Sequence, residues 1–339
     1  MNTIVLTPYE CGINRAAEIL KNGGLVAIPT ETVYGLAANA LDQTAVLNIF
    51  KAKNRPADNP LIVHIANFED IEKFNLAAEF PTKAKLLVQS FWPGPLTVVV
   101  KRGESIPPAV NCGLSTVAIR MPAHTIARKV IAAAGVPLAA PSANSSGKPS
   151  PTTAQHVIED LHGSIDAVLD GGECAIGVES TVISFSGKTP LLLRPGGITV
   201  EQIEGVIGKI AVSPAITAEL PQDAPVESPG LKHKHYSPSK QVTLIDATPQ
   251  EFVKFVNSHS NCGCLCYNED FDLIKTPKIA IGAKCDYAAQ AKALFAALRL
   301  LDEMQGVEQI FAPLPLTDGM GLAVYNRLIR AAGFNILKL

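Results

Sequence analysis

Apolar runs of strand length alternate with amphipathic stretches along the first 200 residues of the chain. Short apolar runs bounded by glycine, proline or polar residues are typical of buried strands, and amphipathic stretches are typical of helices. The predicted strands lie at residues 3–6, 25–28, 61–65, 96–100, 115–122 and 137–140, with two more marked by residues 177–182 and 191–197. The predicted helices lie at residues 14–21, 44–50, 83–90 and 127–134. This alternation predicts an α/β fold.

Residues 240–339 alternate strand and helix more regularly. Strands are predicted at residues 242–246, 263–267, 279–282 and 310–313, and helices at residues 251–258, 287–304 and 322–332. This order predicts a smaller, Rossmann-like parallel α/β domain at the C-terminal end. The stretch before it, residues 214–239, is rich in proline, serine and charge, as interdomain linkers are. Because a chain of 339 residues suggests about two domains, we expect limits at 1–210, 211–239 and 240–339.

Composition narrows the class of protein. A formal net charge of −2 argues against a protein that coats nucleic acid through bulk charge, although a local basic surface remains compatible with it. Seven cysteines at irregular spacing indicate free thiols of a reducing compartment. No apolar run approaches the ~20 residues that a membrane-spanning helix needs. We therefore expect a soluble, cytoplasmic protein without a membrane partner.

The second domain carries two patterns that resemble ligand motifs. Cys262, Cys264 and Cys266 alternate along one predicted strand, so their thiols share one face, and burial there is favoured over zinc binding because no histidine or cysteine cluster accompanies them. The segment Asp318-Gly319-Met320-Gly321 lacks the third glycine of a dinucleotide fingerprint, and no phosphate-binding loop motif occurs. A nucleotide site is therefore expected in the first domain.

A cationic stretch follows the second predicted helix. Lys51, Lys53 and Arg55 come in close succession and are followed by Pro56 and Pro60. Prolines fix the backbone, so such a stretch presents positive charge at little entropic cost, as polyphosphate binding requires. A solvated charged turn is the alternative reading of this stretch alone.

Polar residues also gather where the predicted strands begin and end, which is where α/β proteins commonly hold ligands. These positions are residues 29–36, His64, Arg120, residues 141–152, residues 177–182 and Arg194. His64 alternates with apolar neighbours and is expected to face away from the apolar side, although a lone histidine is more often structural. An arginine on the face of an apolar strand, as at Arg120, needs a carboxylate or an anionic ligand as partner.

Taken together, these segments resemble the threonylcarbamoyl-AMP synthase family, in its long two-domain, YrdC-like form. The motifs that carry the resemblance are P-T-E-T-V-Y-G-L (29–36), K-x-R-P (53–56), N-P-L (59–61), T-V-A-I-R-M-P (116–122), P-S-A-N-x-S-G (141–147), E-S-T-V (179–182) and R-P-G (194–196). Residues 228–238 resemble the linker of that form, with Leu231 where methionine is usual.

The resemblance implies both a fold and a reaction. The fold is an N-terminal YrdC-like twisted mixed-sheet α/β domain with a basic cleft, a linker that folds over the active site, and the smaller C-terminal domain. The reaction is synthesis of L-threonylcarbamoyladenylate from L-threonine, bicarbonate and ATP, with release of pyrophosphate and with Mg²⁺ accompanying ATP. The product would pass to a tRNA threonylcarbamoyl transferase complex that makes N6-threonylcarbamoyladenosine in tRNA, and a weak direct contact with tRNA stays open.

The resemblance also assigns residues to roles. Lys53 and Arg55 are the candidates for catalysis, since they can neutralise phosphates and the leaving pyrophosphate. The candidates for threonine binding are Thr32, His64, Arg120, Ala140 and Ser180. Those for ATP binding are Lys53, Arg55, Asn59, Thr116, Ser142, Asn144, Ser150, Arg194, Ser228, His235 and Tyr236. No protein ligand for a metal is identified.

Two other functions stay open. A basic concave surface could bind double-stranded RNA or tRNA by shape, but the cations here are few and interleaved with small polar residues that suit a small ligand. A carbamoyl-adenylate enzyme of hydrogenase maturation is the second alternative, although the C-x-x-C pairs of such enzymes are missing from this chain.

Overall fold

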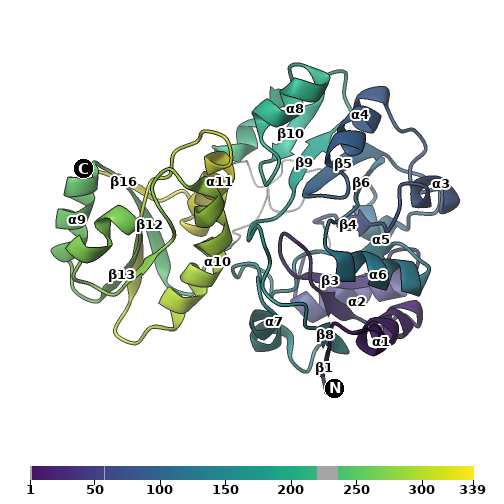
Figure 1. Ribbon diagram of the computed structural model, residues 1–339, viewed down its shortest axis with the longest axis horizontal. Helices are drawn as coiled ribbons and strands as arrows, with labels where there is room; N and C mark the ends of the chain where they lie inside the picture. The colour runs from purple at the N-terminus through teal and green to yellow at the C-terminus, as the bar shows by residue number, and fades with distance from the viewer. Residues whose placement is uncertain (1, 57, 220–235) are drawn as a thin grey trace.

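The structure is a computed structural model, and it describes residues 2–56, 58–219 and 236–339. These residues form two parts, each built around its own sheet (Figure 1). The described strands of the first part are β1 (Ile4–Leu6), β2 (Val26–Ile28), β3 (Gly35–Asn39), β4 (Ile62–His64), β5 (Leu96–Lys101), β6 (Thr116–Arg120), β7 (Leu138–Ala139), β8 (Ala167–Leu169), β9 (Thr181–Ser184), β10 (Leu191–Arg194) and β11 (Ala211–Val212). Its helices are α1 (Glu10–Lys21), α2 (Gln43–Lys53), α3 (Asp70–Lys73), α4 (Thr82–Phe91), α5 (Pro108–Asn111), α6 (Thr125–Ala134), α7 (Ala154–Leu161) and α8 (Val200–Ile207), and a 3₁₀ turn spans Pro214–Ile216.

The first sheet mixes parallel and antiparallel strands in the order β1-β8-β2-β3-β7-β4-β6-β5-β9-β10-β11. At its centre β4 pairs parallel with β6 and antiparallel with β7, which brings His64 level with Arg120 in the register. One apolar core lies between this sheet and α1 and α6, and another packs against α2, α4, α7 and α8. The predicted twisted mixed-sheet α/β domain is confirmed.

Helix α2 is longer than the pattern of residues 44–50 predicts. The Asp42 side chain caps its first turn by accepting from the N–H groups of Thr44 and Ala45. The helix ends at Asn54, whose φ of 50° is left-handed. Lys51 and Lys53 therefore lie in the last turn of the helix and not in a loop, because lysine and alanine continue a helix readily.

The second part is a parallel sheet of five strands within the described residues, in the order β14-β13-β15-β12-β16. Its elements are β12 (Gln241–Asp246), α9 (Pro249–Asn257), β13 (Cys262–Cys266), β14 (Lys278–Ala280), α10 (Tyr287–Glu303), β15 (Gln309–Pro313), α11 (Gly321–Ala331) and β16 (Ile336–Lys338), with a 3₁₀ helix at Asn268–Leu273. The predicted parallel domain is confirmed, and β16 is a strand that the pattern analysis missed. This strand has only three residues and all of them are exposed, so the sequence there lacks the buried apolar run that marks a strand.

The cysteines of β13 are buried in a small apolar core. Cys262, Cys264 and Cys266 pack with Phe252 and Val256 of α9. Among the described residues no group of three or more histidine, cysteine, aspartate or glutamate side chains could hold a metal ion. The expected burial of the three thiols on one face is confirmed.

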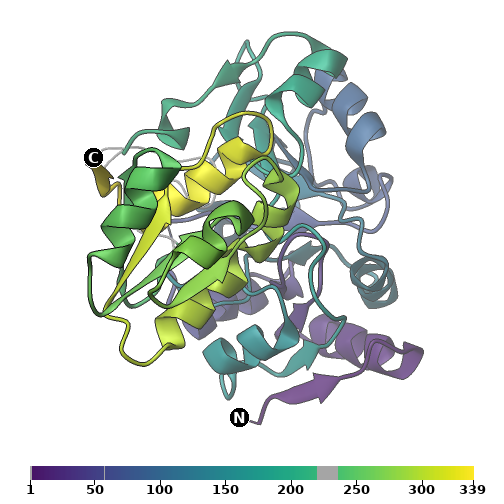
Figure 2. The ribbon, with the colours of Figure 1, turned by 60° about the vertical axis from the view of Figure 1, so that its left-hand side comes forward.

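The long helices α10 and α11 lie on the side of the second sheet that faces the first part (Figures 1 and 2). Val33 and Val178 of the first part join the apolar core of these two helices. Across the described ranges, no helix combines the length and the apolar character that crossing a membrane requires.

Gly196 of the R-P-G segment allows a close backbone approach beside the polar strand ends. A Cβ atom there would lie 2.3 Å from the Thr181 nitrogen and 2.5 Å from the Glu179 carbonyl oxygen. Gly196→Ala is therefore expected to destabilise the protein by about 1–3 kcal/mol, since the crowded atoms are backbone. The matched control is Gly205→Ala in α8, where a Cβ meets nothing within 4 Å and helix propensity predicts a gain of up to about 1 kcal/mol. Denaturant unfolding measures both changes, and equal midpoints for the two variants would contradict this reading of Gly196.

Candidate active site

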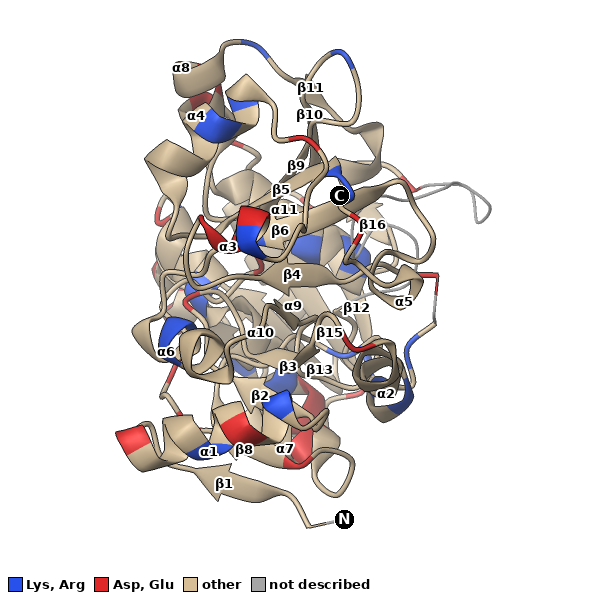
Figure 3. Cartoon of the chain, turned by 90° about the vertical axis from the view of Figure 1, so that its right-hand side faces the viewer, with Lys and Arg blue, Asp and Glu red and all other residues tan. Residues whose placement is uncertain are grey.

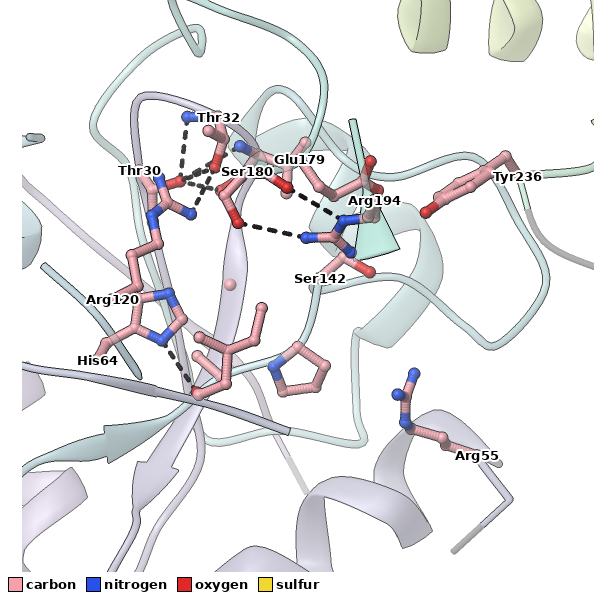
Figure 4. Close-up of a pocket in the computed structure, with 15 residues that line it drawn as sticks. Thr30, Thr32, Arg55, His64, Arg120, Ser142, Glu179, Ser180, Arg194 and Tyr236 are labelled. Carbon is pink, nitrogen blue, oxygen red and sulfur yellow. Dashed lines mark hydrogen bonds between the residues drawn. The ribbon is translucent and has the colours of Figure 1, made fainter. Parts of the chain in front are cut away.

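A small, partly enclosed pocket lies in the first part, among the ends of its central strands (Figure 4). The pocket is lined by Thr30, Thr32, Val33, Gly35, Arg55, Ile62, His64, Arg120, Ala140, Pro141, Ser142, Glu179, Ser180, Arg194 and Tyr236. Three of these side chains are arginines and several others carry hydroxyl groups. The lining therefore suits a small anionic ligand that also makes specific hydrogen bonds.

The lining comes from eight separate stretches of the chain, two of which supply only Arg55 and Tyr236. The turn between β2 and β3 supplies the two threonines, β4 supplies His64, and β6 supplies Arg120. The segment after β7, the residues before β9 and the end of β10 supply the rest of the first-part polar groups. These polar strand ends were singled out in the sequence, and the sheet brings them together because the register of β4, β6 and β7 aligns their ends.

All five candidates for threonine binding line the pocket, namely Thr32, His64, Arg120, Ala140 and Ser180. Arg120 already has protein partners: its Nη1 donates to Thr32 Oγ1 over 2.9 Å, and its Nη2 pairs with Glu31 Oε1 over 2.6 Å. Burial alone would raise the pKa of the Glu31 carboxyl, but the neighbouring Arg120 holds that pKa below its usual range. Glu31 is thus a charged partner that the sequence analysis did not assign, although it stands inside the P-T-E-T motif.

His64 lies at the end of β4 with its imidazole in the pocket wall. Its Nδ1 donates to the carbonyl oxygen of Ile62 over 3.1 Å. Burial, with a smaller effect from Arg120, lowers the pKa of His64 to about 3. The imidazole is therefore neutral near pH 7 and leaves Nε2 as an acceptor.

Four of the ATP candidates line the same pocket: Arg55, Ser142, Arg194 and Tyr236. Arg55 donates to the carbonyl oxygens of Asn59 and Pro60 over 3.2 and 3.3 Å. Burial lowers the pKa of Arg55 to about 10, so the side chain stays charged at neutral pH. Figure 4 shows its guanidinium on the opposite side of the pocket from Arg120.

Arg194 and Tyr236 lie toward the second part of the chain. Arg194 donates from Nε to the Ser180 carbonyl oxygen over 3.1 Å and from Nη2 to the Ser180 hydroxyl over 3.3 Å. Tyr236 is buried with a left-handed φ of 65°, and its ring stacks on Phe295 of α10 at 5.3 Å between centroids. Burial raises the pKa of the Tyr236 hydroxyl, which therefore stays protonated and able to donate.

Lys53 lies outside the pocket lining. Its side chain is only 1% exposed, and Nζ donates to the carbonyl oxygens of Ser142 and Asn144. Burial lowers the pKa of Lys53 well below its ordinary value. In this arrangement Lys53 holds the backbone of the segment that carries Ser142, and its effect on the pocket is indirect.

The remaining described ATP candidates do not line the pocket, and some of them contact residues that do. Asn144 donates to the Ser145 and Lys148 carbonyl oxygens, and the Ser150 hydroxyl donates to Glu179 Oε1. The Asn59 carbonyl accepts from Arg55, while Thr116 lines a different pocket beside Lys101. Ser228 and His235 lie outside the described residues.

The pocket does not fit a dedicated magnesium site. Glu179 is the one carboxylate among its lining residues, and both of its oxygens already have partners in Ser150 and Arg327. Magnesium prefers an octahedron of oxygen ligands, and in nucleotide sites it is bound largely by phosphates and water. The side chains that line this pocket therefore offer magnesium no carboxylate without a partner.

The fold and the pocket define a two-domain α/β enzyme with an arginine-lined pocket at the strand ends of its first domain. A family model described as "Telomere recombination" matches residues 18–196, and one described as "Threonylcarbamoyl-AMP synthase, C-terminal domain" matches residues 198–333. The chain belongs to the threonylcarbamoyl-AMP synthase family, in its long two-domain form.

The relatives match over nearly the whole chain. Threonylcarbamoyl-AMP synthase of Pyrococcus abyssi is 47% identical over 97% of this chain and 96% of its own length. Threonylcarbamoyl-AMP synthase of Bacillus subtilis is 43% identical over 98% of this chain and 96% of its own length. The crystal structure of Pyrococcus abyssi Sua5 complexed with L-threonine superposes with a TM-score of 0.92 at 44% identity and covers 100% of both chains.

The low pKa of His64 predicts how the free energy of unfolding varies with pH. Its folded value of about 3 lies below the ordinary 6.5, so from pH 6.5 down to about 3 the unfolded chain binds a proton that the folded chain refuses. Stability is therefore expected to fall with falling pH across this window, by at most about 1.4 kcal/mol per pH unit from this residue. His64→Asn keeps a donor for the Ile62 carbonyl but does not titrate, so its unfolding free energy should vary less between pH 6.5 and 5. Equal pH slopes for the variant and the wild type would show that His64 protonates in the folded state.

Proposed function

We propose that this protein synthesises L-threonylcarbamoyladenylate from L-threonine, bicarbonate and ATP and releases pyrophosphate. One observation carries the proposal: a single pocket joins all five threonine candidates to four of the ATP candidates. The family membership supports the same reaction, as does the name of the Pyrococcus abyssi complex with L-threonine.

The arrangement of charges suits this reaction. The carbamate formed from threonine and bicarbonate is an anion, and its oxygen must attack the anionic α-phosphorus of ATP while pyrophosphate leaves. Cations that are fixed in place lower such a barrier by positioning the reactants and stabilising charge, and no protein nucleophile is required. Arg55 and Arg194 are placed to neutralise the phosphates, because both are buried in the wall that also carries Ser142.

Threonine would bind at the Arg120 end of the pocket. Its carboxylate can compete with Glu31 for the Arg120 guanidinium, which pairs with Glu31 through one nitrogen in this structure. The hydroxyl groups of Thr32 and Ser180 lie at the same end and can bond the amino acid. Neutral His64 would serve as a hydrogen-bonding group there and would not add charge.

Two further assignments concern the phosphates. Lys53, predicted to act on them directly, would act through the Ser142 and Asn144 carbonyls in the arrangement described, which holds the ATP-binding segment in shape. Magnesium would arrive with ATP and spread the phosphate charge, and its ligands would be largely phosphate oxygens and water, since both oxygens of the one carboxylate in the lining already have partners.

The proposal extends to the biological setting. The product would be handed to a tRNA threonylcarbamoyl transferase complex for N6-threonylcarbamoyladenosine formation, and the protein would work in the cytoplasm. Seven free cysteines support a reducing compartment. We also propose the domain limits 1–210, 211–239 and 240–339. The second sheet, whose described strands span residues 241–338, supports the limit at residue 240, whereas the strands of the first sheet extend to residue 212.

The RNA-binding alternative has less support. Its surface would need spread, exposed cations, but Arg55, Arg120 and Arg194 are buried in the pocket wall. In the view of Figure 3 the basic and acidic residues that the structure describes are interspersed along the chain.

The first experiment measures pyrophosphate release from ATP with bicarbonate, comparing L-threonine, L-serine and no amino acid. Release is expected only when both L-threonine and bicarbonate are present, because the attacking group is the threonine carbamate. Equal background release in every tube, together with salt-sensitive RNA binding, would favour the binding module instead.

Arg55→Gln tests the phosphate assignment. Removing one charged donor aimed at the transition state is expected to lower turnover by about 10²–10³-fold. Lys51→Gln is the matched control, because Lys51 is an exposed cation one turn earlier in the chain and lies outside this pocket. The measurement is steady-state pyrophosphate release with unfolding midpoints recorded alongside, and wild-type turnover in Arg55→Gln would remove Arg55 from the catalytic assignment.

A further inference from the structure

Two arginines of the second domain enter the first domain beside the pocket. Arg299 comes from α10 and Arg327 from α11, the two helices that face the first domain. They are 8% and 0% exposed, and both pair with carboxylates of the first domain. Since buried charges are costly unless they are fully paired, their placement at this interface calls for a physical reason.

Arg327 holds the strand ends that form the pocket wall. Its Nε donates to Glu179 Oε2 over 2.7 Å, and its Nη2 donates to the Pro195 carbonyl oxygen over 3.0 Å. The Nη2 group also lies 3.3 Å from the Glu179 carbonyl oxygen. Glu179 belongs to the E-S-T-V motif and Pro195 to the R-P-G motif. The Arg327 side chain therefore connects both motifs to the second domain.

Glu179 carries this contact into the pocket. It lines the pocket, and its second oxygen, Oε1, accepts from the Ser150 hydroxyl. Burial alone would raise the pKa of the Glu179 carboxyl, but Arg327 and Arg194 hold that pKa below its usual range. A charged Glu179 thus fixes the orientation of Ser150, an ATP candidate that makes no other side-chain bond to the described residues.

Arg299 binds the residue next to Ser150. Its Nη2 donates to the Pro149 carbonyl oxygen over 2.6 Å and to Asp160 Oδ2 over 2.7 Å. Asp160 also pairs with Lys148 over 3.0 Å. Residues 148–150 are therefore held by α10 through Arg299 and by α11 through Arg327 and Glu179.

We propose that Arg299 and Arg327 are positioning residues through which the second domain fixes Ser150 and Glu179 and thereby sets the affinity of the first-domain pocket for ATP. The inference rests on the proposed function for the identity of the nucleotide. It gives the C-terminal domain a defined part in the reaction: neither arginine touches the reacting atoms, and both act through first-domain groups.

An ordinary domain interface would not need this arrangement. Replacing a buried ion pair by apolar side chains is often neutral or stabilising, so adhesion alone does not account for the Arg327–Glu179 pair. The same interface has an exposed pair, Lys292 with Glu173 at 3.5 Å, whose side chains are 47% and 55% exposed. Exposed pairs of this kind contribute little, which makes Lys292 a suitable control.

The test compares Arg327→Gln, Arg327→Lys, Arg299→Gln and Lys292→Gln in the full-length protein. The affinity for a non-hydrolysable ATP analogue and the affinity for L-threonine are each measured by calorimetry, beside KM values for both substrates and unfolding midpoints. We expect Arg327→Gln and Arg299→Gln to weaken analogue binding by roughly 2- to 30-fold, the range for coupling through an intermediate group, with a smaller change for L-threonine. Lys292→Gln should match the wild type, and Arg327→Lys should recover part of the loss because it keeps the charge.

A loss of stability in Arg327→Gln alone would reflect Glu179 left buried without its cation. The double variant Glu179→Gln with Arg327→Gln removes both charges and keeps the test valid, because its analogue affinity should still fall. Unchanged analogue affinity in this double variant and in Arg299→Gln would overturn the proposal, as would equal losses for the analogue and L-threonine. If the wild type releases no threonine-dependent pyrophosphate while the variants still weaken analogue binding, the proposed function fails and the positioning role stands.

Discussion

The central constraint on this structure is the crowding of buried cations around one pocket. Arg55, Arg120 and Arg194 line it together, and like charges in a poorly solvated space repel one another. Each is held by oxygen atoms of the first domain: backbone carbonyls for Arg55, Glu31 for Arg120 and Ser180 for Arg194. Glu179, the carboxylate in the lining, is already matched by Arg327. The lining thus holds three guanidinium groups and one carboxylate, and this concentration of cations suits an anionic ligand.

The sequence predicted the pocket well where strand ends carry it. Thr32, His64, Arg120 and Ser180 each lie in or beside an apolar run, so the pattern marked them as residues at strands and their ends. The family resemblance then assigned them to one site. The sequence could not place Lys53, because whether a lysine ends in solvent or under a loop depends on the packing of residues 142–144, which lie about 90 positions away. Helix α2 also extends to Lys53, so this lysine lies in a helix and not in the predicted loop.

The ion pairs between the two domains could not be predicted from the sequence for a related reason. Arg327 and Glu179 are 148 residues apart, and α11 reads as an ordinary amphipathic helix whose polar positions give no sign that one arginine is wholly buried. The order of strands and helices in the second domain, apart from β16, could be predicted because alternating apolar and amphipathic segments indicate it. The pairing of its helices with another domain depends on surface shape, which no local pattern contains.

The second domain also bears on how the pocket opens. Tyr236 closes one side of it, and the ring is held between Phe295 of α10 and the guanidinium of Arg327. The next residue, Ser237, bonds both domains, through its N–H to the Gly147 carbonyl and through its hydroxyl to the Ala331 carbonyl. Opening this side therefore requires that Tyr236 leave its ring stack or that α10 and α11 move with it. The same few residues join this side of the pocket to the two helices of the second domain and to the segment next to Ser150.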